Sequence, residues 1–120
     1  MTSVKFEQVA INSLKDDLKL LDANKVFLVT GKKSYTNSGA KEIIENLKGN
    51  FEFIRFEDFE DNPNIIDVEK GVKFFKENNC DCIIAIGGGS SIDMAKLIKF
   101  FTPKIKPFIG KFNLQLLYKD

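Results

Sequence analysis

Three consecutive glycines followed by two serines are the residues of this sequence whose types and spacing could do chemistry. Without Cβ atoms, the backbone of Gly87, Gly88 and Gly89 can turn sharply and approach a ligand closely. Where such a loop leads into a helix, the free amides of the first turn carry a partial positive charge that favours an anion. Ser90 and Ser91 add hydroxyl groups that can donate to a phosphate oxygen. The loop is therefore predicted to bind a phosphate group.

Purely structural interpretations of the same loop stay open. Glycine-rich turns between a strand and a helix also occur for packing alone, and Ser90 or Ser91 can cap the helix without binding a ligand. The spacing departs from the dinucleotide-binding fingerprint, because Ile92 stands where the third glycine belongs and the loop follows the third strand instead of the first. It is not a P-loop either, because no Gly-Lys-Ser/Thr lies at the required offset.

The cysteines do not indicate a metal site or a disulfide. Cys80 and Cys82 are separated by one residue, and a bridge between two positions so close together on an extended strand would be strained. The chain has no histidine, which leaves few ligands for a transition metal. Both cysteines are predicted to be free thiols beside a buried strand.

Buried strands and amphipathic helices alternate along the chain and would place the glycine loop at a sheet edge. Apolar runs predict three strands, the second towards an edge and the third at the centre, at residues 25–31, 51–56 and 82–86. Apolar residues at helical spacing predict four helices: one before the first strand, one at residues 40–47 closed by Gly49, one at residues 66–79, and one after the glycines. Polar residues 32–38 are predicted to form a loop. This alternation predicts an α/β fold with a parallel sheet covered by helices on both faces, and ligands in such folds bind at the carboxyl ends of the strands.

Bulk composition is that of one ordinary globular domain. The chain has 120 residues, of which 43% are hydrophobic and 29% charged. Its net charge of +1 comes from 18 basic and 17 acidic residues, so no field of one sign favours nucleic acid. No apolar run approaches the roughly 20 residues of a membrane helix, and no secretory signal is visible in the first residues. We expect a cytoplasmic protein with no membrane partner.

A longer segment around the glycines resembles a known family. Residues 81–96, Asp-Cys-Ile-Ile-Ala-Ile-Gly-Gly-Gly-Ser-Ser-Ile-Asp-Met-Ala-Lys, are similar to the Gly-Gly-Gly-Ser-x-x-Asp-x-Ala-Lys segment of iron-containing (group III) alcohol dehydrogenases. Asn62-Pro63 resembles the family's upstream Asn-Pro element, and residues 26–30 resemble its first nucleotide-site strand. Ser90 stands where the related glycerol dehydrogenases and dehydroquinate synthases tend to have lysine, which favours the alcohol dehydrogenase branch.

The resemblance implies a Rossmann-like domain that binds NAD(P). It implies that Gly88, Gly89 and Ser90 hold the cofactor pyrophosphate and that Asp93 lies near the nicotinamide. Gly87 and Ser91 complete the same predicted site. Lys96 also belongs to the motif, and its role stays open.

The end of the first strand departs from the pattern of many NAD-preferring members of the family. Those members have an aspartate whose carboxylate accepts hydrogen bonds from the adenosine ribose, whereas this chain has Gly31, followed by Lys32, Lys33 and Ser34. A carboxylate would repel the extra phosphate of NADP, and two ammonium groups with a hydroxyl would attract it. We therefore expect NADP(H) to be preferred over NAD(H). The alternative is that Lys32 and Lys33 are solvated loop charges.

The resemblance also implies what residues 1–120 would lack. The family holds its metal, iron or another divalent ion, with an aspartate and three histidines in a downstream helical domain, and this sequence has no histidine. We expect residues 1–120 to be the NAD(P)-binding domain, with no catalytic or metal-binding residue, and to be inactive alone on the alcohol or aldehyde of the complete enzyme. The alternative is a stand-alone phosphate-binding or interaction module. Apolar residues in the segment 101–120, which has no clear periodicity, are expected to pack on the domain or on a partner, so the chain could form a homo-oligomer.

Overall fold

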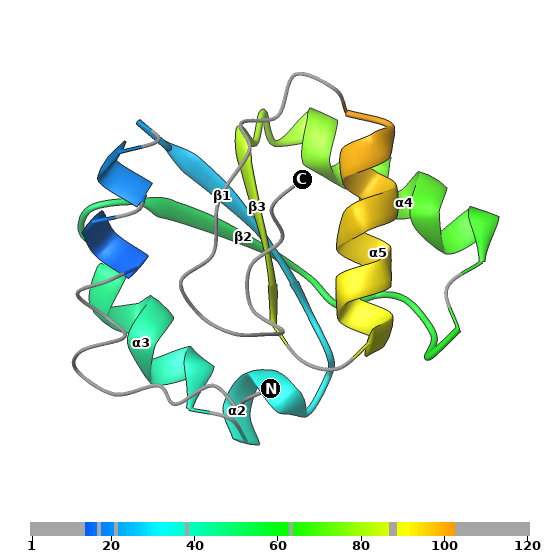
Figure 1. Ribbon diagram of the computed structural model, residues 1–120, viewed down its shortest axis with the longest axis horizontal. Helices are drawn as coiled ribbons and strands as arrows, with labels where there is room; N and C mark the ends of the chain where they lie inside the picture. The colour runs from blue at the N-terminus through cyan, green and yellow to red at the C-terminus, as the bar shows by residue number, and fades with distance from the viewer. Residues whose placement is uncertain are drawn as a thin grey trace.

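The fold is a parallel sheet with helices on both faces, as the sequence predicts. The computed structural model describes residues 14–16, 18–20, 22–37, 39–62, 64–86 and 89–102. Its three strands are β1 (Lys25–Thr30), β2 (Glu52–Phe56) and β3 (Cys82–Ile86), in the order β2-β1-β3. Both neighbours of β1 run parallel to it, and the strands lie between two helical layers (Figure 1). This confirms the α/β, Rossmann-like fold class.

Four helices have defined bounds: α2 (Ser34–Asn37), α3 (Ala40–Leu47), α4 (Ile65–Glu77) and α5 (Gly89–Phe100). A further helical stretch covers residues 14–16 and 18–20. In Figure 1, α4 and α5 lie on one side of the sheet, and α3 with helical residues 14–16 and 18–20 lies on the other. No helix among these described residues is long and apolar enough to cross a membrane.

Strand β1 supplies side chains to both hydrophobic cores. Val26 and Leu28 belong to the cluster that includes Ile43 and Leu47 of α3. Phe27 and Val29 point to the opposite face and join the cluster formed with α4 and α5. Successive side chains of a strand alternate between faces, and an apolar residue at every position therefore requires a cover on each side. The continuous apolar run of β1 thus builds both layers at once.

The amino ends of β1 and β3 are aligned by one carboxylate. The Asp81 side chain accepts hydrogen bonds from the backbone N–H groups of Asn24, at 3.2 and 3.1 Å, and Lys25, at 3.1 Å. The register then pairs Val26 with Cys82 and Thr30 with Ile86. Both strands therefore end level at the carboxyl edge of the sheet.

Three details differ from the sequence prediction. The sequence placed the third strand at the centre, but β1 is central and β3 lies at one end of the described sheet, because a continuous apolar run reports burial on both faces and not strand order. The segment predicted as a loop contains the short helix α2. Helix α3 ends at the C-cap Lys48, in right-handed conformation, and the described glycine with positive φ is Gly39 at the start of α3, not Gly49.

Candidate functional site

The carboxyl edge of the sheet brings together two of the predicted site segments. The backbone N–H of Gly31, directly after β1, donates to the carbonyl oxygen of Ile86 at 3.3 Å. Ile86 is the last residue of β3 and immediately precedes the three glycines. The turn after β1 and the start of the glycine loop are therefore neighbours, as expected of the ligand edge of a parallel sheet.

Helix α5 begins inside the predicted phosphate loop. Gly87 and Gly88 lie outside the described residues, and Gly89 is the first residue of α5. Ser90 and Ser91 are already helical, so the idea that either caps the helix is wrong, because a capping residue stands before the first turn and is not itself helical. Asp93 follows as an exposed residue of the same helix.

The two serines have different surroundings. The hydroxyl of Ser90 donates a hydrogen bond to the backbone carbonyl of Asp61, in the loop between β2 and α4. Ser91 is buried, with 2% of its surface exposed. The Ser90 contact connects the glycine-rich segment to Asp61, which immediately precedes the Asn62-Pro63 element in the sequence.

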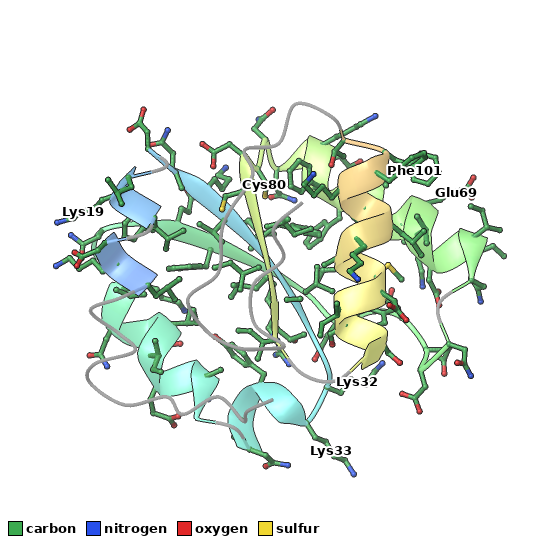
Figure 2. All side chains as sticks on the ribbon, viewed as in Figure 1. Lys19, Lys32, Lys33, Glu69, Cys80 and Phe101 are labelled. Atoms are coloured by element: carbon green, nitrogen blue, oxygen red, sulfur yellow. The ribbon has the colours of Figure 1, made fainter. Side chains whose placement is uncertain are left out.

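The two lysines after β1 lie at the same edge but have different contacts (Figure 2). The Lys32 ammonium donates to the carbonyl oxygens of Glu57 and Phe59, each at 3.2 Å. It therefore attaches the turn after β1 to the loop after β2. Lys33 is exposed, and Ser34 begins α2. Both lysines are exposed, but the two carbonyl partners of Lys32 show that it is not a simply solvated charge.

Arg55 is a cation of this edge that the sequence analysis did not single out. Its Nε donates to the Thr30 hydroxyl at 2.8 Å, and its guanidinium forms an ion pair with Glu57 at 2.7 Å. The guanidinium carbon also lies 4.3 Å from the centre of the Tyr35 ring, within the range of a cation–π contact. The available signal was an arginine near the end of an otherwise mostly apolar strand, at the edge where ligands of parallel sheets bind.

The cysteines are free thiols, as predicted. Cys82 is buried in β3 and Cys80 is half-buried just before it. Burial raises the pKa of the Cys80 thiol from 9.0 to about 12, and the neighbouring Lys25 lowers the pKa by less. In the ranges that the structure describes, no group of three or more His, Cys, Asp or Glu residues could hold a metal ion.

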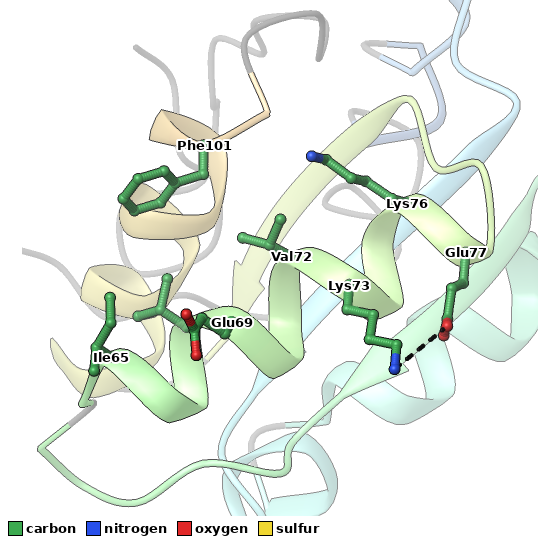
Figure 3. Close-up of a pocket in the computed structure, with 8 residues that line it drawn as sticks. Ile65, Glu69, Val72, Lys73, Lys76, Glu77 and Phe101 are labelled. Carbon is green, nitrogen blue, oxygen red and sulfur yellow. Dashed lines mark ion pairs between the residues drawn. The ribbon is translucent and has the colours of Figure 1, made fainter.

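An apolar groove of about 500 Å³ lies elsewhere on the molecule. It runs along α4 on the face that Phe101, just after α5, approaches (Figure 3). Ile65 and Val72 contribute apolar lining, and Lys73 and Glu77 pair across one helical turn at 4.0 Å. None of its lining residues belongs to the predicted phosphate loop or to the turn after β1, so the groove is separate from the carboxyl-edge site.

Comparison with known proteins decides the family. The sequence profile described as "Iron-containing alcohol dehydrogenase" matches residues 2–117. The chain belongs to the iron-containing alcohol dehydrogenase family. It is 40% identical over 101 residues to an enzyme named NADH-dependent butanol dehydrogenase B from Clostridium acetobutylicum, covering 81% of this chain and 25% of that one. It is 36% identical over 98 residues to a protein named choline dehydrogenase from Bacillus subtilis (strain 168), covering 81% of this chain and 24% of that one.

The fold of this member of the iron-containing alcohol dehydrogenase family is similar to that of a solved structure. A 1,3-propanediol oxidoreductase superposes with a TM-score of 0.66 at 28% identity, covering 80% of this chain and 26% of that one. The 120 residues therefore span about a quarter of the length of the relatives that they match.

The donor set for the family's metal is not among the described residues. The sequence contains no histidine, and the ranges described hold no cluster of three or more potential ligands. The side chains that the structure describes do not fit such an ion.

Proposed function

We propose that this chain is the cofactor-binding half of an NAD(P)-dependent alcohol or aldehyde oxidoreductase. The observation that carries the proposal is the meeting of three segments at one sheet edge. The turn after β1 bonds to the end of β3 through Gly31, and Ser90 at the start of α5 bonds to the loop after β2 through Asp61. Membership of the alcohol dehydrogenase family supplies the reaction class.

The pyrophosphate is proposed to bind at Gly87–Ser91, with Asp93 nearby. Support comes from the position of α5, whose twelve residues start at Gly89 directly after the sheet edge. The dipole and free amides at the start of a helix favour a phosphate group. A Cβ atom in the loop would keep the protein backbone from approaching the cofactor closely.

The test is a titration of the purified chain with NADPH and NADH, followed by the enhancement of nicotinamide fluorescence or by calorimetry. Gly88→Val should abolish binding of both. Gly49→Ala is the matched control, because a methyl group there meets no atom within 4 Å. If the wild-type chain bound neither dinucleotide, or bound unrelated nucleotides equally well, the cofactor role would be wrong and a stand-alone interaction module would replace it.

A preference for NADP(H) over NAD(H) is part of this proposal. Relatives include proteins named for NADH, such as the butanol dehydrogenases of Clostridium acetobutylicum. In this chain the position after β1 is Gly31 and not a carboxylate, and Lys32, Lys33 and Ser34 follow it. The exposure of Lys33 supports a contact with the 2′-phosphate of NADP(H).

Titration with the two cofactors tests the preference directly. We expect the wild-type chain to bind NADPH about tenfold more tightly than NADH, equivalent to about 1.4 kcal/mol. Lys33→Gln should reduce that ratio with little effect on NADH. Equal affinities, unchanged in a Lys32→Gln, Lys33→Gln double variant, would reject the preference.

Catalysis is proposed to need the rest of the family's fold. Hydride transfer requires the nicotinamide and the substrate carbonyl to be held together in one closed site. The family's metal, iron or another divalent ion, would be held there and not by these residues. We expect no turnover of alcohols or aldehydes by this chain alone in the presence of NADP⁺. A cytoplasmic location and homo-oligomer formation stay predictions.

A further inference from the structure

Arg55 connects β2 with the turn that follows β1. Besides Thr30 and Glu57, its guanidinium NH₂ group donates to the backbone carbonyls of Gly31 at 3.4 Å and Lys32 at 3.5 Å. About 31% of the Arg55 side chain is exposed, so the group is open to solvent and not sealed in the core. One side chain therefore contacts three consecutive residues of the segment that the proposed function assigns to the adenosine end of the cofactor.

These contacts decide which way the turn presents its amides. In a trans peptide the C=O and the following N–H point in opposite directions. With the carbonyls of Gly31 and Lys32 directed towards the guanidinium, the N–H groups of Lys32 and Lys33 point away from it. Donors held in this way are suited to an anion on the other side of the turn, because backbone amides that converge in a turn bind phosphate oxygens.

The aromatic ring of Tyr35 packs against the guanidinium group of Arg55. Tyr35 is buried, with 7% of its surface exposed, and its ring forms part of the core under α3. Stacking on an aromatic face restrains a planar guanidinium. The ammonium group of a lysine could not stack in this way and make the same hydrogen bonds. The arginine is thus held in one orientation by the ring on one side and by the Thr30 hydroxyl at its Nε.

The ion pair between Arg55 and Glu57 also sets the net charge beside the turn after β1. Glu57 is 44% exposed on its side chain, and its own backbone carbonyl accepts from Lys32. Without a partner, its carboxylate would be an unpaired negative charge close to the turn after β1. Such a charge favours a ribose hydroxyl and disfavours a phosphate monoester in the same place.

We propose that Arg55 is a positioning residue for cofactor choice, which orients the amides after β1 and neutralises Glu57 so that the 2′-phosphate of NADP(H) is accepted. This inference rests on the proposed function, because it needs a dinucleotide at the carboxyl edge. It assigns to Arg55 an effect on the ratio of the two affinities, and not on dinucleotide binding in general.

The experiment measures NADPH and NADH affinities of the full chain for wild type, Arg55→Met, Arg55→Lys and the double variant Arg55→Met with Glu57→Gln. Arg55→Met should weaken NADPH binding about tenfold or more while NADH changes less than about threefold. Arg55→Lys should fall between wild type and Arg55→Met. Removing the carboxylate as well should recover part of the NADPH affinity. Lys48→Met, which removes an exposed pair with Glu45 on α3, is the matched control and should leave both affinities unchanged.

The outcomes separate the two proposals. If Arg55→Met weakened NADPH and NADH by the same factor, Arg55 would be merely structural and this inference would be wrong, while the proposed function would stand. If the wild-type chain bound neither cofactor, both would fail. If Arg55→Met did not fold, as judged by circular dichroism, Arg55→Lys decides: a reduced NADPH to NADH affinity ratio supports the inference, and an unchanged ratio overturns it.

Discussion

The hydroxyl of Ser90, in the first turn of α5, donates a hydrogen bond to the backbone carbonyl of Asp61, in the loop that leads to α4. This contact joins the start of α5 to the loop after β2. The hydrogen bonds from Lys32 to the carbonyl oxygens of Glu57 and Phe59 join the turn after β1 to the same loop. The loop after β2 is therefore fastened at both ends to the segments that are proposed to bind the cofactor.

Replacing Ser90 should loosen this loop. Ser90→Ala removes the donor and should reduce the free energy of unfolding by about 1 kcal/mol, the usual net value of one hydrogen bond. Urea denaturation measures the loss, and hydrogen exchange should increase at residues 59–62. Asp61→Ala is the control, because the acceptor is the backbone carbonyl and the side chain is exposed. A loss as large for Asp61→Ala as for Ser90→Ala would contradict the assigned contact.

Gly71 permits the close packing of α4 against α5. A Cβ added there would lie 2.5 Å from Cδ1 of Ile98 and 3.0 Å from Cε2 of Phe56. Both side chains are buried, so they have little room to move. Overpacking should therefore cost Gly71→Ala up to about 3 kcal/mol, which is more than the roughly 1 kcal/mol that alanine gains in helix propensity. Thermal or urea unfolding should show a net loss, whereas Gly49→Ala should stay within about 0.5 kcal/mol of wild type.

Asn64 determines where α4 begins. Its side chain accepts a hydrogen bond from the backbone N–H of Asp67 at 2.9 Å. Asn64→Ala should destabilise the chain by about 1 kcal/mol, because that N–H loses its acceptor. Asn64→Asp keeps an acceptor oxygen and adds a favourable charge at the helix start, so its unfolding midpoint should match or exceed that of wild type. Equal losses for the two variants would show that Asn64 acts in another way.

Strands could be predicted from the sequence because their signal is local. Residues 26–29 and 82–86 are continuous apolar runs, and such segments require cover on both faces. Strand order depends on pairing between segments far apart in sequence, so the expectation that residues 82–86 lie at the centre had no local basis. The short helix at Ser34–Asn37 was missed for a similar reason, because a single aromatic residue among three polar ones shows no apolar period.

The candidate site was predictable only in part. Position and glycine content marked the start of α5, whereas nothing in the local sequence of Arg55 indicates its contacts with Thr30 and Tyr35. Those contacts arise from the parallel register, which pairs Arg55 with Leu28 and so places it near the end of β1. Likewise, the two lysines after Gly31 look equivalent in the sequence, and only the loop after β2 distinguishes Lys32 from Lys33.

The Cys80 thiol should react slowly with alkylating reagents in the folded chain. Burial raises its pKa to about 12 in the folded chain, compared with an ordinary value of 9.0. Alkylation depends on the thiolate, so iodoacetamide should label Cys80 slowly at pH 8.5 in the folded chain and rapidly in urea. Mass spectrometry of the labelled peptide checks this expectation.

The sign of the stability effect follows from the same pKa. At pH values well below 9.0 the thiol is almost fully protonated in both states, so it makes no pH-dependent contribution there. Between 9.0 and about 12 the unfolded chain releases the proton and the folded chain retains it, so stability should fall as pH rises through this range. Other groups titrate there as well, and the comparison of wild type with Cys80→Ala isolates the cysteine. The free energy of unfolding of Cys80→Ala should decline less than that of wild type between pH 8 and pH 10.5, and parallel declines would rule out a raised thiol pKa.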